Sequence, residues 1–312
     1  MNDMTCTFII ISFNQADTIR ESIQSAIEQD CDNFRLVICD DGSTDGTNII
    51  IREVLKQNIK DNIEVIFLEN KVNIGIVGNF NRALQYVVGD FFITQAGDDI
   101  SLANRVSVTK RIFDNNEVSA CFSATYDIDD AGNSLGSDYG YTINKRNMRL
   151  GGISITSCLY DEAGVLGASA AYRTKLISDF SLAVVAFSED KSLSLRGALI
   201  GKVIFYEEPL VKYRRTSGVT ISGRKCLKMY ARLMYRRSRY FKSITRDGYF
   251  LKSKFNSKKA KSKILKLRKS CVFSHLLLKK KINAFTFIFY CFKSKLYNKV
   301  ILRAAYYYTK GK

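Results

Sequence analysis

The stretch that decides the fold is VICDDGSTDGT, at residues 37–47. Its first part is a short apolar run of the kind that forms a buried β-strand, and the run ends in two aspartates. Asp45 and Gly46 are typical of a tight turn, and Thr47 can cap a helix that continues to about Asn58. This stretch therefore predicts a strand, a polar turn and a helix in succession.

Strand-like and helix-like patterns alternate on both sides of this stretch, through the first 125 residues. Strands are predicted at 5–12, 35–39, 64–69, 91–94 and near 120–126, and helices at 18–29, 47–58, 79–87 and 102–114. Repeated strand–helix units predict an α/β fold with a mostly parallel sheet flanked by helices. Ligands of such sheets bind beyond the carboxyl ends of the strands.

Polar clusters follow three of the predicted strands at the point where each strand ends. Ser12-Phe13-Asn14 follows the first strand, Asp40-Asp41-Gly42-Ser43 the second, and Gly97-Asp98-Asp99 the fourth. Because the carboxyl ends of parallel strands lie at one edge of a sheet, the three clusters are expected to meet there. The sequence therefore predicts a single pocket lined by all three.

Asp98 and Asp99 are adjacent carboxylates at the end of a buried strand, so they repel each other and need a cation or hydrogen bonds to compensate. Mg²⁺ and Mn²⁺ prefer oxygen ligands and often take only one or two carboxylates together with substrate phosphates. One interpretation is therefore a metal site shared with a nucleotide diphosphate. The other is an ordinary solvated Asp-Asp turn.

Several common motifs are absent. The aspartate-rich turn is not an EF-hand, because counting from Asp41 places Arg52 where that loop needs a bidentate glutamate. No GxxxxGK[ST] loop occurs, and no GxGxxG follows the first strand. Calcium binding by an EF-hand is excluded, and neither a P-loop NTPase nor an ordinary dinucleotide-binding domain is supported.

Beyond the first 125 residues the pattern changes. Residues 127–165 lose periodicity and gain Gly, Ser, Asn and Asp, which predicts a long surface connection that orders over a ligand. Regular structure is expected again at 166–172 and in a core-packed helix over 189–201. An apolar content of 46% and a charged content of 25% over 312 residues exclude wholesale disorder.

The net charge of +18 is divided unequally along the chain. Residues 211–312 contain 30 Lys and Arg but one acid, Asp247, whereas residues 1–210 contain 18 Lys and Arg against 29 acids. The basic tail is interleaved with Tyr, Phe, Leu and Ile, which suits an ordinary solvated helical face, an anionic membrane surface or, as the runner-up, nucleic acid. No apolar run approaches the ~20 residues of a spanning helix.

The eight cysteines form no CxxC pair, which favours reduced thiols in a cytosolic protein over disulfides. The N-terminus has no basic region before its short apolar run, so a signal peptide is not expected. We therefore expect a cytoplasmic protein.

Five motifs, in this order and spacing, resemble glycosyltransferase family 2 with its GT-A, Rossmann-like fold. They are Phe8 to Asn14 (FIIISFN), Val37 to Thr47 (VICDDGSTDGT), Asn73 to Ala83 (NIGIVGNFNRA), Gly97-Asp98-Asp99, and Glu189 to Arg196 (EDKSLSLR). The resemblance implies a GT-A domain at 1–216, with a nucleotide-sugar half at 1–105 and an acceptor half at 106–216. A basic amphipathic region at 217–312 follows, with expected membrane association.

The resemblance also implies roles for residues on the nucleotide side. Ser12 and Phe13 would line the nucleobase site, with Phe13 stacked on uracil, and Asp41 would accept the uracil imide proton. Asp98 would hold the ribose. Asp99 would ligate Mn²⁺ or Mg²⁺ at the diphosphate. The family often has Tyr rather than Phe13, and stacking needs only the ring.

On the acceptor side, the resemblance implies that Asp190 is the catalytic base, with Glu189 beside it. The family often has a His after a Tyr-Arg pair near the end of the domain, but this sequence has Arg214 and Arg215 there. One of these arginines, Arg214 first, is therefore expected to meet the diphosphate.

The activity implied is inverting, metal-dependent transfer of a hexose, glucose as the first candidate, from a UDP-sugar to a polyprenyl-diphosphate-linked sugar. The sequences of the motifs are similar to those of bacterial enzymes that build O-antigen or other surface polysaccharides. The acceptors of such enzymes lie in the inner membrane. This implies a β-linked product and a peripheral position on the cytoplasmic face of that membrane, with nucleic acid disfavoured as a partner. The alternative is a catalytically inactive nucleotide-sugar-binding module whose tail binds membrane or nucleic acid.

Overall fold

The computed structural model describes residues 6–31, 33–58, 63–149, 152–154, 157–158, 164–178 and 188–215, and in the C-terminal part 235, 238, 258–278, 283–284 and 286–288. The chain divides into two compact units, one of residues 1–184 with 188–217 and one of 185–187 with 218–312. The proposed division of the first unit into halves at residue 105 stays a prediction.

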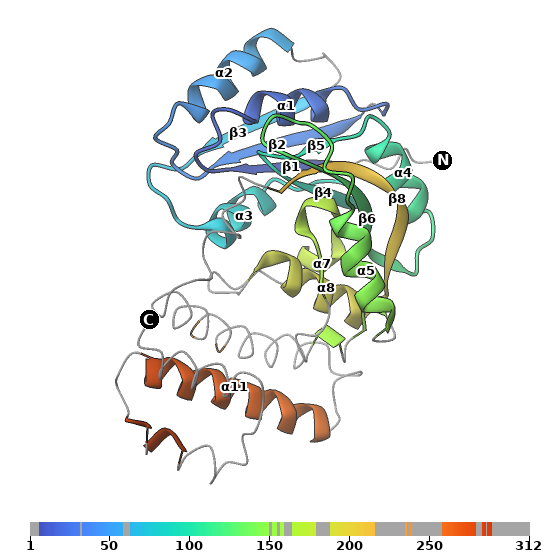
Figure 1. Ribbon diagram of the computed structural model, residues 1–312. Helices are drawn as coiled ribbons and strands as arrows, with labels where there is room; N and C mark the ends of the chain where they lie inside the picture. The colour runs from blue at the N-terminus through green and yellow to red at the C-terminus, as the bar shows by residue number, and fades with distance from the viewer. Residues whose placement is uncertain are drawn as a thin grey trace. The chain divides into compact units, whose positions relative to one another are not determined.

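The N-terminal part of the first unit alternates strands and helices, as the sequence predicts (Figure 1). The elements are β1 (Cys6–Ser12), α1 (Ile19–Ile27), β2 (Phe34–Asp40), α2 (Thr47–Asn58), β3 (Glu64–Glu69), α3 (Ile76–Leu84), β4 (Phe91–Ala96), β5 (Ile100–Ser101), α4 (Arg105–Phe113) and β6 (Val118–Ile128). The later elements are α5 (Tyr139–Arg149), the 3₁₀ turn η1 (Gly167–Ser169), β7 (Ala170–Arg173), α7 (Lys175–Ser178), α8 (Glu189–Ile200) and β8 (Lys202–Arg214).

The eight strands form one mixed sheet in the order β3-β2-β1-β4-β7-β6-β8-β5. β1 pairs in parallel with both β2 and β4, and β2 pairs in parallel with β3. β6 and β8 are also parallel, whereas β7 is antiparallel to both of its neighbours and β5 is antiparallel to β8. The strand order reverses direction between β1 and β4, and such a switch point is where a ligand-binding crevice forms.

Helices cover both faces of the sheet, which explains why the central strands are nearly continuous apolar runs. On one face, α1, α2 and α4 pack against side chains such as Phe8, Leu36 and Phe91. On the other face, α3, α7 and α8 pack against Ile9 and Phe92 (Figure 1). The carboxyl ends of the parallel strands are left uncovered by these packed helices and carry the polar clusters.

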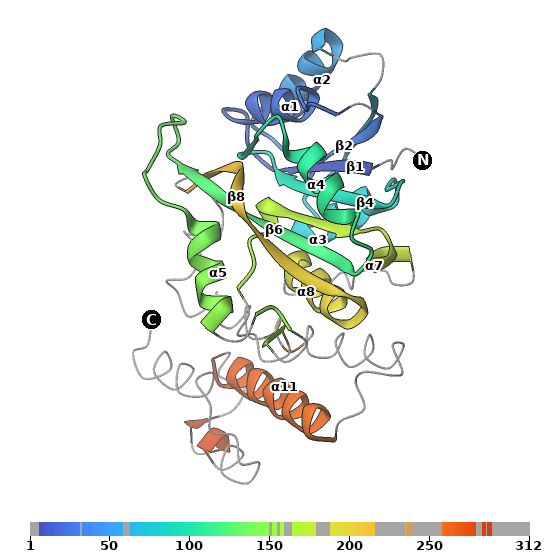
Figure 2. The same ribbon diagram turned by 90° about the vertical axis from the view of Figure 1, so that its right-hand side faces the viewer.

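Two elements differ from the sequence-based expectation. Residues 139–149 were expected in a surface connection, but they form α5, a helix whose buried positions are Gly140, Asn144 and Asn147. A helix that buries glycine and asparagine has no apolar period to detect, so its pattern indicated a loop. β8 was also not expected; it runs beside β6 (Figure 2), and the only proline of the chain, Pro209, lies where the register with β6 shifts.

In the second unit, the described residues include α11 (Lys258–Leu278), which agrees with the predicted helical tail. Cys271 and Leu277 are buried, and the ring of Tyr235 lies 5.3 Å from that of His275. Within the described parts of the chain, no helix combines the length and apolar character needed to cross a bilayer. Most of the predicted basic region at 217–312 lies outside the described residues.

Candidate functional site

The three polar clusters meet at the carboxyl edge of the sheet, as predicted. The Ser12 hydroxyl donates a hydrogen bond to Asp40 Oδ1 at 2.9 Å, which joins the ends of β1 and β2. The backbone N–H of Asp41 donates to the Ser12 carbonyl at 2.9 Å. Gly97, after β4, donates its N–H to the carbonyl of Ile11 at 3.0 Å. These backbone bonds extend the sheet beyond its strands and fix the loops against one another.

Gly97 lies in close contact with side chains of the loop after β1 and of α1. A Cβ atom at this position would lie 2.5 Å from Gln15 Oε1, 2.8 Å from the end of the Ile19 side chain and 3.1 Å from Ser12 Cβ. A larger residue would therefore make the Gln15 and Ile19 side chains move and would press against Ser12.

Asp40 shapes its own turn. Its Oδ1 accepts hydrogen bonds from the hydroxyls of Ser12 and Ser43, at 2.9 and 2.5 Å, and its Oδ2 accepts from the Ser43 N–H at 2.9 Å. Gly42, in the left-handed region at φ 70°, allows the turn to approach the backbone of Val72, where a Cβ would lie 2.8 Å away. Asp40 is therefore occupied in forming the turn.

Asp41 holds a second segment over this turn. Its Oδ1 accepts from Asn70 Nδ2 and the Ile74 N–H, both at 2.9 Å, and its Oδ2 accepts from the Gly75 N–H at 2.8 Å. The residue is 2% exposed. Since a carboxylate oxygen can accept two hydrogen bonds, Oδ2 keeps one acceptor position for a ligand N–H.

Phe13 is the exposed aromatic at this edge, with 37% of its surface accessible. Its neighbour Asn14 adopts a left-handed backbone, φ 51°, and is tied to the aspartate turn in both directions. The Asn14 N–H donates to the Ser43 hydroxyl, and the Asn14 side-chain oxygen accepts from the Thr44 N–H, each at 2.9 Å. Asn14 was not among the site residues predicted, although asparagine is the residue type that most readily adopts this conformation after glycine.

The Asp98-Asp99 pair has the opposite hydrogen-bonding pattern. Asp99 is 1% exposed; its Oδ1 accepts from the Arg214 N–H at 3.0 Å, but its Oδ2 is buried with no hydrogen-bond partner. Burial and, second, repulsion by Asp98 raise the pKa of Asp99 well above its ordinary value. Burial also raises the pKa of Asp98. A cation would relieve both effects.

The residues present fit a divalent cation of the Mn²⁺ or Mg²⁺ kind. Asp99 offers an unpaired carboxylate oxygen, which is the hard ligand that these ions prefer. Among the described residues, no group of three or more His, Cys, Asp or Glu side chains forms a complete cage. The remaining ligands must therefore come from elsewhere, and diphosphate oxygens are the usual source for an ion held by one or two carboxylates.

The Arg214 side chain is not accessible in the way that its predicted contact with a diphosphate would need. Its side chain is 2% exposed, and four of its five N–H groups have protein acceptors: the carbonyls of Asp98, Asp129 and Asp130, and Glu21 Oε2. The guanidinium therefore clamps the Asp98-Asp99 loop instead of facing an open site. This contact also explains why the loop stays in place despite the repulsion between its carboxylates.

Arg215 is the other arginine that the sequence placed near the diphosphate. Its guanidinium lies 4.5 Å from the centre of the Tyr139 ring and donates to Asp127 Oδ2 at 3.0 Å. Its side chain is 36% exposed, so it is the more accessible of the two arginines. Of the pair, Arg215 is thus the one whose charge reaches solvent.

Glu189 and Asp190 form a second pair of buried acids at the first turn of α8. Glu189 Oε2 is buried without a hydrogen-bond partner, and burial, followed by repulsion from Asp190, raises the pKa of Glu189 to about 8. Burial also raises the pKa of Asp190, whose Oδ1 accepts from the Lys191 N–H at 2.6 Å. At neutral pH the pair therefore tends to hold a proton, which is a property of catalytic acid–base groups.

Tyr172, on β7, has a buried hydroxyl with no hydrogen-bond partner. Burial and, second, the charges of Asp190 and Glu189 raise the pKa of this hydroxyl well above its ordinary value. It was not predicted, because a tyrosine in an apolar strand looks like an ordinary core residue. Only its position beside the acids distinguishes it.

The two acid pairs are connected through β4. The Thr94 hydroxyl, on β4, donates to the Gly167 carbonyl at 2.7 Å. Gly167 in turn packs on the second pair: a Cβ built on it would lie 3.3 Å from Glu189 Oε1 and 3.4 Å from Asp190 Cβ. One end of β4 thus carries Asp98-Asp99 and its flank supports Glu189-Asp190.

The mixed sheet with helices on both faces is the GT-A fold, as predicted, and solved structures share it. The Staphylococcus aureus TarS structure in complex with UDP-GlcNAc superposes with a TM-score of 0.57 at 15% identity, covering 99% of this chain and 93% of that chain. The mannosyltransferase PcManGT from Pyrobaculum calidifontis, in complex with GDP-Man and Mn²⁺, gives 0.54 at 15% identity, covering 96% and 84%. At such identities the likeness establishes the fold alone.

The family is established by sequence. The model for glycosyl transferase family 2 matches residues 7–180, more than half of the chain, and the chain belongs to this family. It is 33% identical over 119 residues to WfgD of Escherichia coli, named as a UDP-Glc:alpha-D-GlcNAc-diphosphoundecaprenol beta-1,3-glucosyltransferase. It is 31% identical over 120 residues to WfaP of the same species, which carries the same functional name.

These alignments are partial. Each covers 38% of this chain and 45% of the relative. The chain thus matches less than half the length of these two relatives, and their substrates are properties of those proteins.

Proposed function

We propose that this protein is an inverting glycosyltransferase that moves a hexose, glucose first, from a UDP-sugar to a lipid-diphosphate-linked sugar in surface polysaccharide synthesis. The observation that carries the proposal is that each of two acid pairs contains a buried carboxylate oxygen without a hydrogen-bond partner. These oxygens are Asp99 Oδ2, in the loop after β4, and Glu189 Oε2, in the first turn of α8. The names of WfgD and WfaP supply the candidate donor and acceptor.

On the donor side, Phe13 would stack on uracil and the open acceptor position of Asp41 Oδ2 would take the imide N–H. Ser12 would line the base, and Asp98 would hold the ribose. A divalent cation held by Asp99 would supply neutralisation of the charge that develops on the departing diphosphate. Arg214 keeps the loop of both aspartates in place, and Arg215 is the arginine that would reach the diphosphate.

On the acceptor side, Asp190 would remove the proton of the acceptor hydroxyl as that oxygen attacks the anomeric carbon. The bond to the diphosphate breaks as the glycosidic bond forms. Such a single displacement inverts the anomeric centre, so an α-linked donor gives a β-linked product. Glu189 sits beside the base and shares its buried environment.

The test is UDP release by the purified full-length chain with Mn²⁺ or Mg²⁺. Donors are UDP-glucose, UDP-galactose and the UDP-N-acetylhexosamines, each with a synthetic GlcNAc- or GalNAc-diphosphate-lipid. We expect acceptor-dependent release that Asp99→Ala and Asp190→Ala abolish. Normal turnover in both variants would refute the site assignment, and absence of acceptor-dependent release with every donor would favour the inactive binding module instead.

The basic C-terminal region is proposed to hold the protein at the cytoplasmic face of the inner membrane. Residues 217–312 contain 27 Lys and Arg against one acid, which supports attraction to anionic lipid, at about 1 kcal/mol per cationic residue near the surface. The test is sedimentation of the full-length chain with vesicles. Binding to phosphatidylglycerol vesicles that is lost in high salt and absent with neutral lipid is expected; equal binding to both would refute it.

A further inference from the structure

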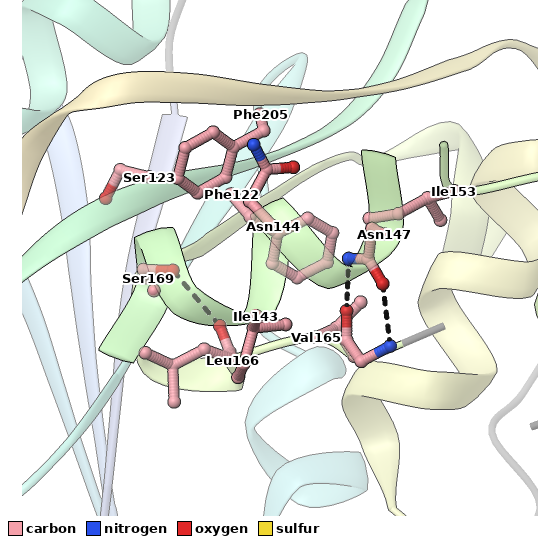
Figure 3. A pocket seen from close by; sticks show the side chains of 12 residues that line it. Phe122, Ser123, Ile143, Asn144, Asn147, Ile153, Val165, Leu166, Ser169 and Phe205 are labelled. Carbon is pink, nitrogen blue, oxygen red and sulfur yellow. Dashed lines mark hydrogen bonds between the residues drawn. The ribbon is translucent and has the colours of Figure 1, made fainter. Parts of the chain in front are cut away.

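Buried asparagine side chains in the first unit make two kinds of contact. Asn147, on α5, pairs with the backbone: its amide makes two hydrogen bonds to Gly164, at 2.6 and 2.9 Å (Figure 3). Asn70 and Asn79 instead form a chain of side-chain hydrogen bonds that ends on the Asp41 carboxylate. Since asparagine is mostly exposed in proteins, a buried pair beside a proposed ligand-binding group needs a physical explanation.

Asn79, on α3, is the fixed end of this chain. It is 2% exposed, and its Nδ2 donates to the Cys39 carbonyl at 2.8 Å. Its Oδ1 accepts from the Cys39 thiol and from Asn70 Nδ2, both at 2.9 Å. A carbonyl can only accept a hydrogen bond, so the Cys39 carbonyl fixes which way the Asn79 amide points. The amide oxygen of Asn79 therefore faces Asn70.

Asn70, directly after β3, lies between Asn79 and Asp41. It is buried, and its Nδ2 donates to Asn79 Oδ1 and to Asp41 Oδ1, both at 2.9 Å. Its Oδ1 accepts from the Arg82 guanidinium, which also donates to the Glu69 carbonyl at 2.7 Å. A guanidinium can only donate, so the Asn70 amide cannot turn over without losing hydrogen bonds on both sides. Both N–H groups of Asn70 are therefore held on acceptors, and one of these acceptors is Asp41.

The consequence for Asp41 is a carboxylate whose plane is fixed. The last torsion of an aspartate side chain is broad, so hydrogen bonds and not rotamer preference decide where its two oxygens lie. Asp41 Oδ1 accepts from Asn70 and from the Ile74 N–H, which fills the two positions that one carboxylate oxygen offers. Oδ2 accepts only from the Gly75 N–H. A single acceptor position is left, and Asn70 helps to decide its direction.

We propose that Asn70 is a positioning residue for nucleobase recognition, which holds the Asp41 carboxylate so that one oxygen is left to accept the imide N–H of uracil. The inference rests on the proposed use of a uridine nucleotide. Because both N–H groups of Asn70 are used within the chain, this residue acts through Asp41 and not on the base. One free acceptor position suits uracil, which has one imide N–H, better than guanine, which presents a ring N–H beside an amino group.

The test is isothermal titration calorimetry of the full-length protein with Mn²⁺ present, with UDP and its N3-methyl analogue as probes. The methyl group removes the imide N–H but leaves the diphosphate unchanged. The wild type should bind UDP at least about tenfold more tightly than the analogue, as expected for a hydrogen bond to a charged group. Asn70→Leu should weaken UDP binding about fivefold and leave binding of the analogue unchanged, because only UDP contacts Asp41.

Two further variants separate positioning from a loss of structure. Asn147→Leu is the matched control, because it makes the same substitution at a buried asparagine that also loses its hydrogen bonds to the chain. It should lower the melting temperature but keep the wild-type preference for UDP. Arg82→Met, at a half-buried position, removes one support of Asn70 and leaves the buried amides in place. It should weaken UDP binding about threefold with no effect on the analogue.

An unchanged preference for UDP in Asn70→Leu, or equal weakening of UDP and the analogue, would overturn the positioning role and leave the proposed transferase function standing. If Asn70→Leu does not fold, an unchanged preference in Arg82→Met overturns the role instead. A wild type that binds both probes equally, or neither, would show that Asp41 does not bind the imide. The inference then fails together with that part of the proposed function, while acceptor-dependent UDP release still decides the transfer reaction.

Discussion

Two aspartate pairs follow β2 and β4, two strands of the same sheet that are separated by β1, yet their surroundings are opposite. Asp40 and Asp41, after β2, are both buried, and every carboxylate oxygen of the pair accepts a hydrogen bond from the chain. Asp99, after β4, is equally buried but has an oxygen without a partner. The Asp-Asp pair after β2 therefore mainly builds a loop. The pair after β4 has a carboxylate oxygen left over for a group that the chain does not supply.

The difference arises from the segments that cross each turn. The β2 turn is covered by residues 73–75, which aim two backbone N–H groups at Asp41. The β4 turn is covered by the end of β8, which supplies a single backbone N–H, that of Arg214. Glu189-Asp190 resembles the β4 pair, since Glu189 Oε2 is also unpaired. One unsatisfied acid thus follows the end of β4, and another lies beside this strand.

The largest effect is expected at Asp190. Asp190→Asn removes the proposed base but keeps the size of the side chain, so kcat should fall about 10²–10⁴-fold, as for loss of a general base. KM for the UDP-sugar should stay within about twofold, because the nucleotide loops are untouched. Steady-state kinetics with a lipid-diphosphate acceptor measures both, and a variant with wild-type kcat would remove Asp190 from the mechanism.

The difference between the two aspartate pairs can be tested by making the same substitution, Asp to Asn, in each pair. Asp41→Asn places an NH₂ where backbone N–H groups converge, so it should cost about 1–3 kcal/mol and lower the melting temperature. Asp99→Asn removes a buried charge whose pKa is raised, so it should raise the melting temperature in metal-free buffer. Thermal unfolding in the presence of EDTA measures both. If both substitutions shifted the melting temperature in the same direction, the two pairs would not differ as described.

The pH dependence of stability tests whether Glu189 is a buried acid with a raised pKa. Its pKa rises from an ordinary 4.5 to about 8 on folding, so between these values the folded state binds more protons than the unfolded state. Stability from this group is therefore complete below about pH 4.5 and is lost as pH rises to about 8. Glu189→Gln should unfold at the same temperature as the wild type near pH 4.5 and at a higher temperature at pH 8. A constant difference across this range would show that Glu189 is not the titrating group.

The smallest expected effect is at Phe13, whose exposed ring lies at the edge shared by the two pairs. Phe13→Leu keeps an apolar side chain but removes the stacking surface, which is worth about 1–3 kcal/mol per base by alanine substitution in nucleic-acid sites. KM for the UDP-sugar should rise about fivefold, toward the lower end of that range, with kcat unchanged. Competition with free UDP checks the effect, which should be the same for UDP as for the sugar nucleotide.

Much of the N-terminal part of the fold could be predicted from sequence, because continuous apolar strands and amphipathic helices leave strong periodic signals. The bounds of α2 and β3 agree with the expectation. α5 could not be predicted, because its buried face is Gly140, Asn144 and Asn147 and carries no apolar period.

The site was predictable as a set of motifs but not as a set of contacts. The strand–helix pattern placed Asp41 and Asp99 at one edge, the family resemblance assigned Asp190 as the base, and the convergence of the loops after β1, β2 and β4 is confirmed. The partners of Arg214 lie more than 80 residues away from it in the chain. Such contacts leave no local pattern, so the difference between a satisfied and an unsatisfied acid could be known only from the structure.

The central claim is that the unpaired acid after β4 holds a cation together with the nucleotide. Electron paramagnetic resonance titration of Mn²⁺ into the full-length protein, at saturating UDP, tests it directly. Asp99→Asn should weaken Mn²⁺ binding at least about 100-fold, since loss of even an outer-shell partner costs 10–100-fold. Asp190→Asn, the matched change in the other pair, should bind Mn²⁺ as the wild type does. Wild-type affinity in Asp99→Asn would contradict the account.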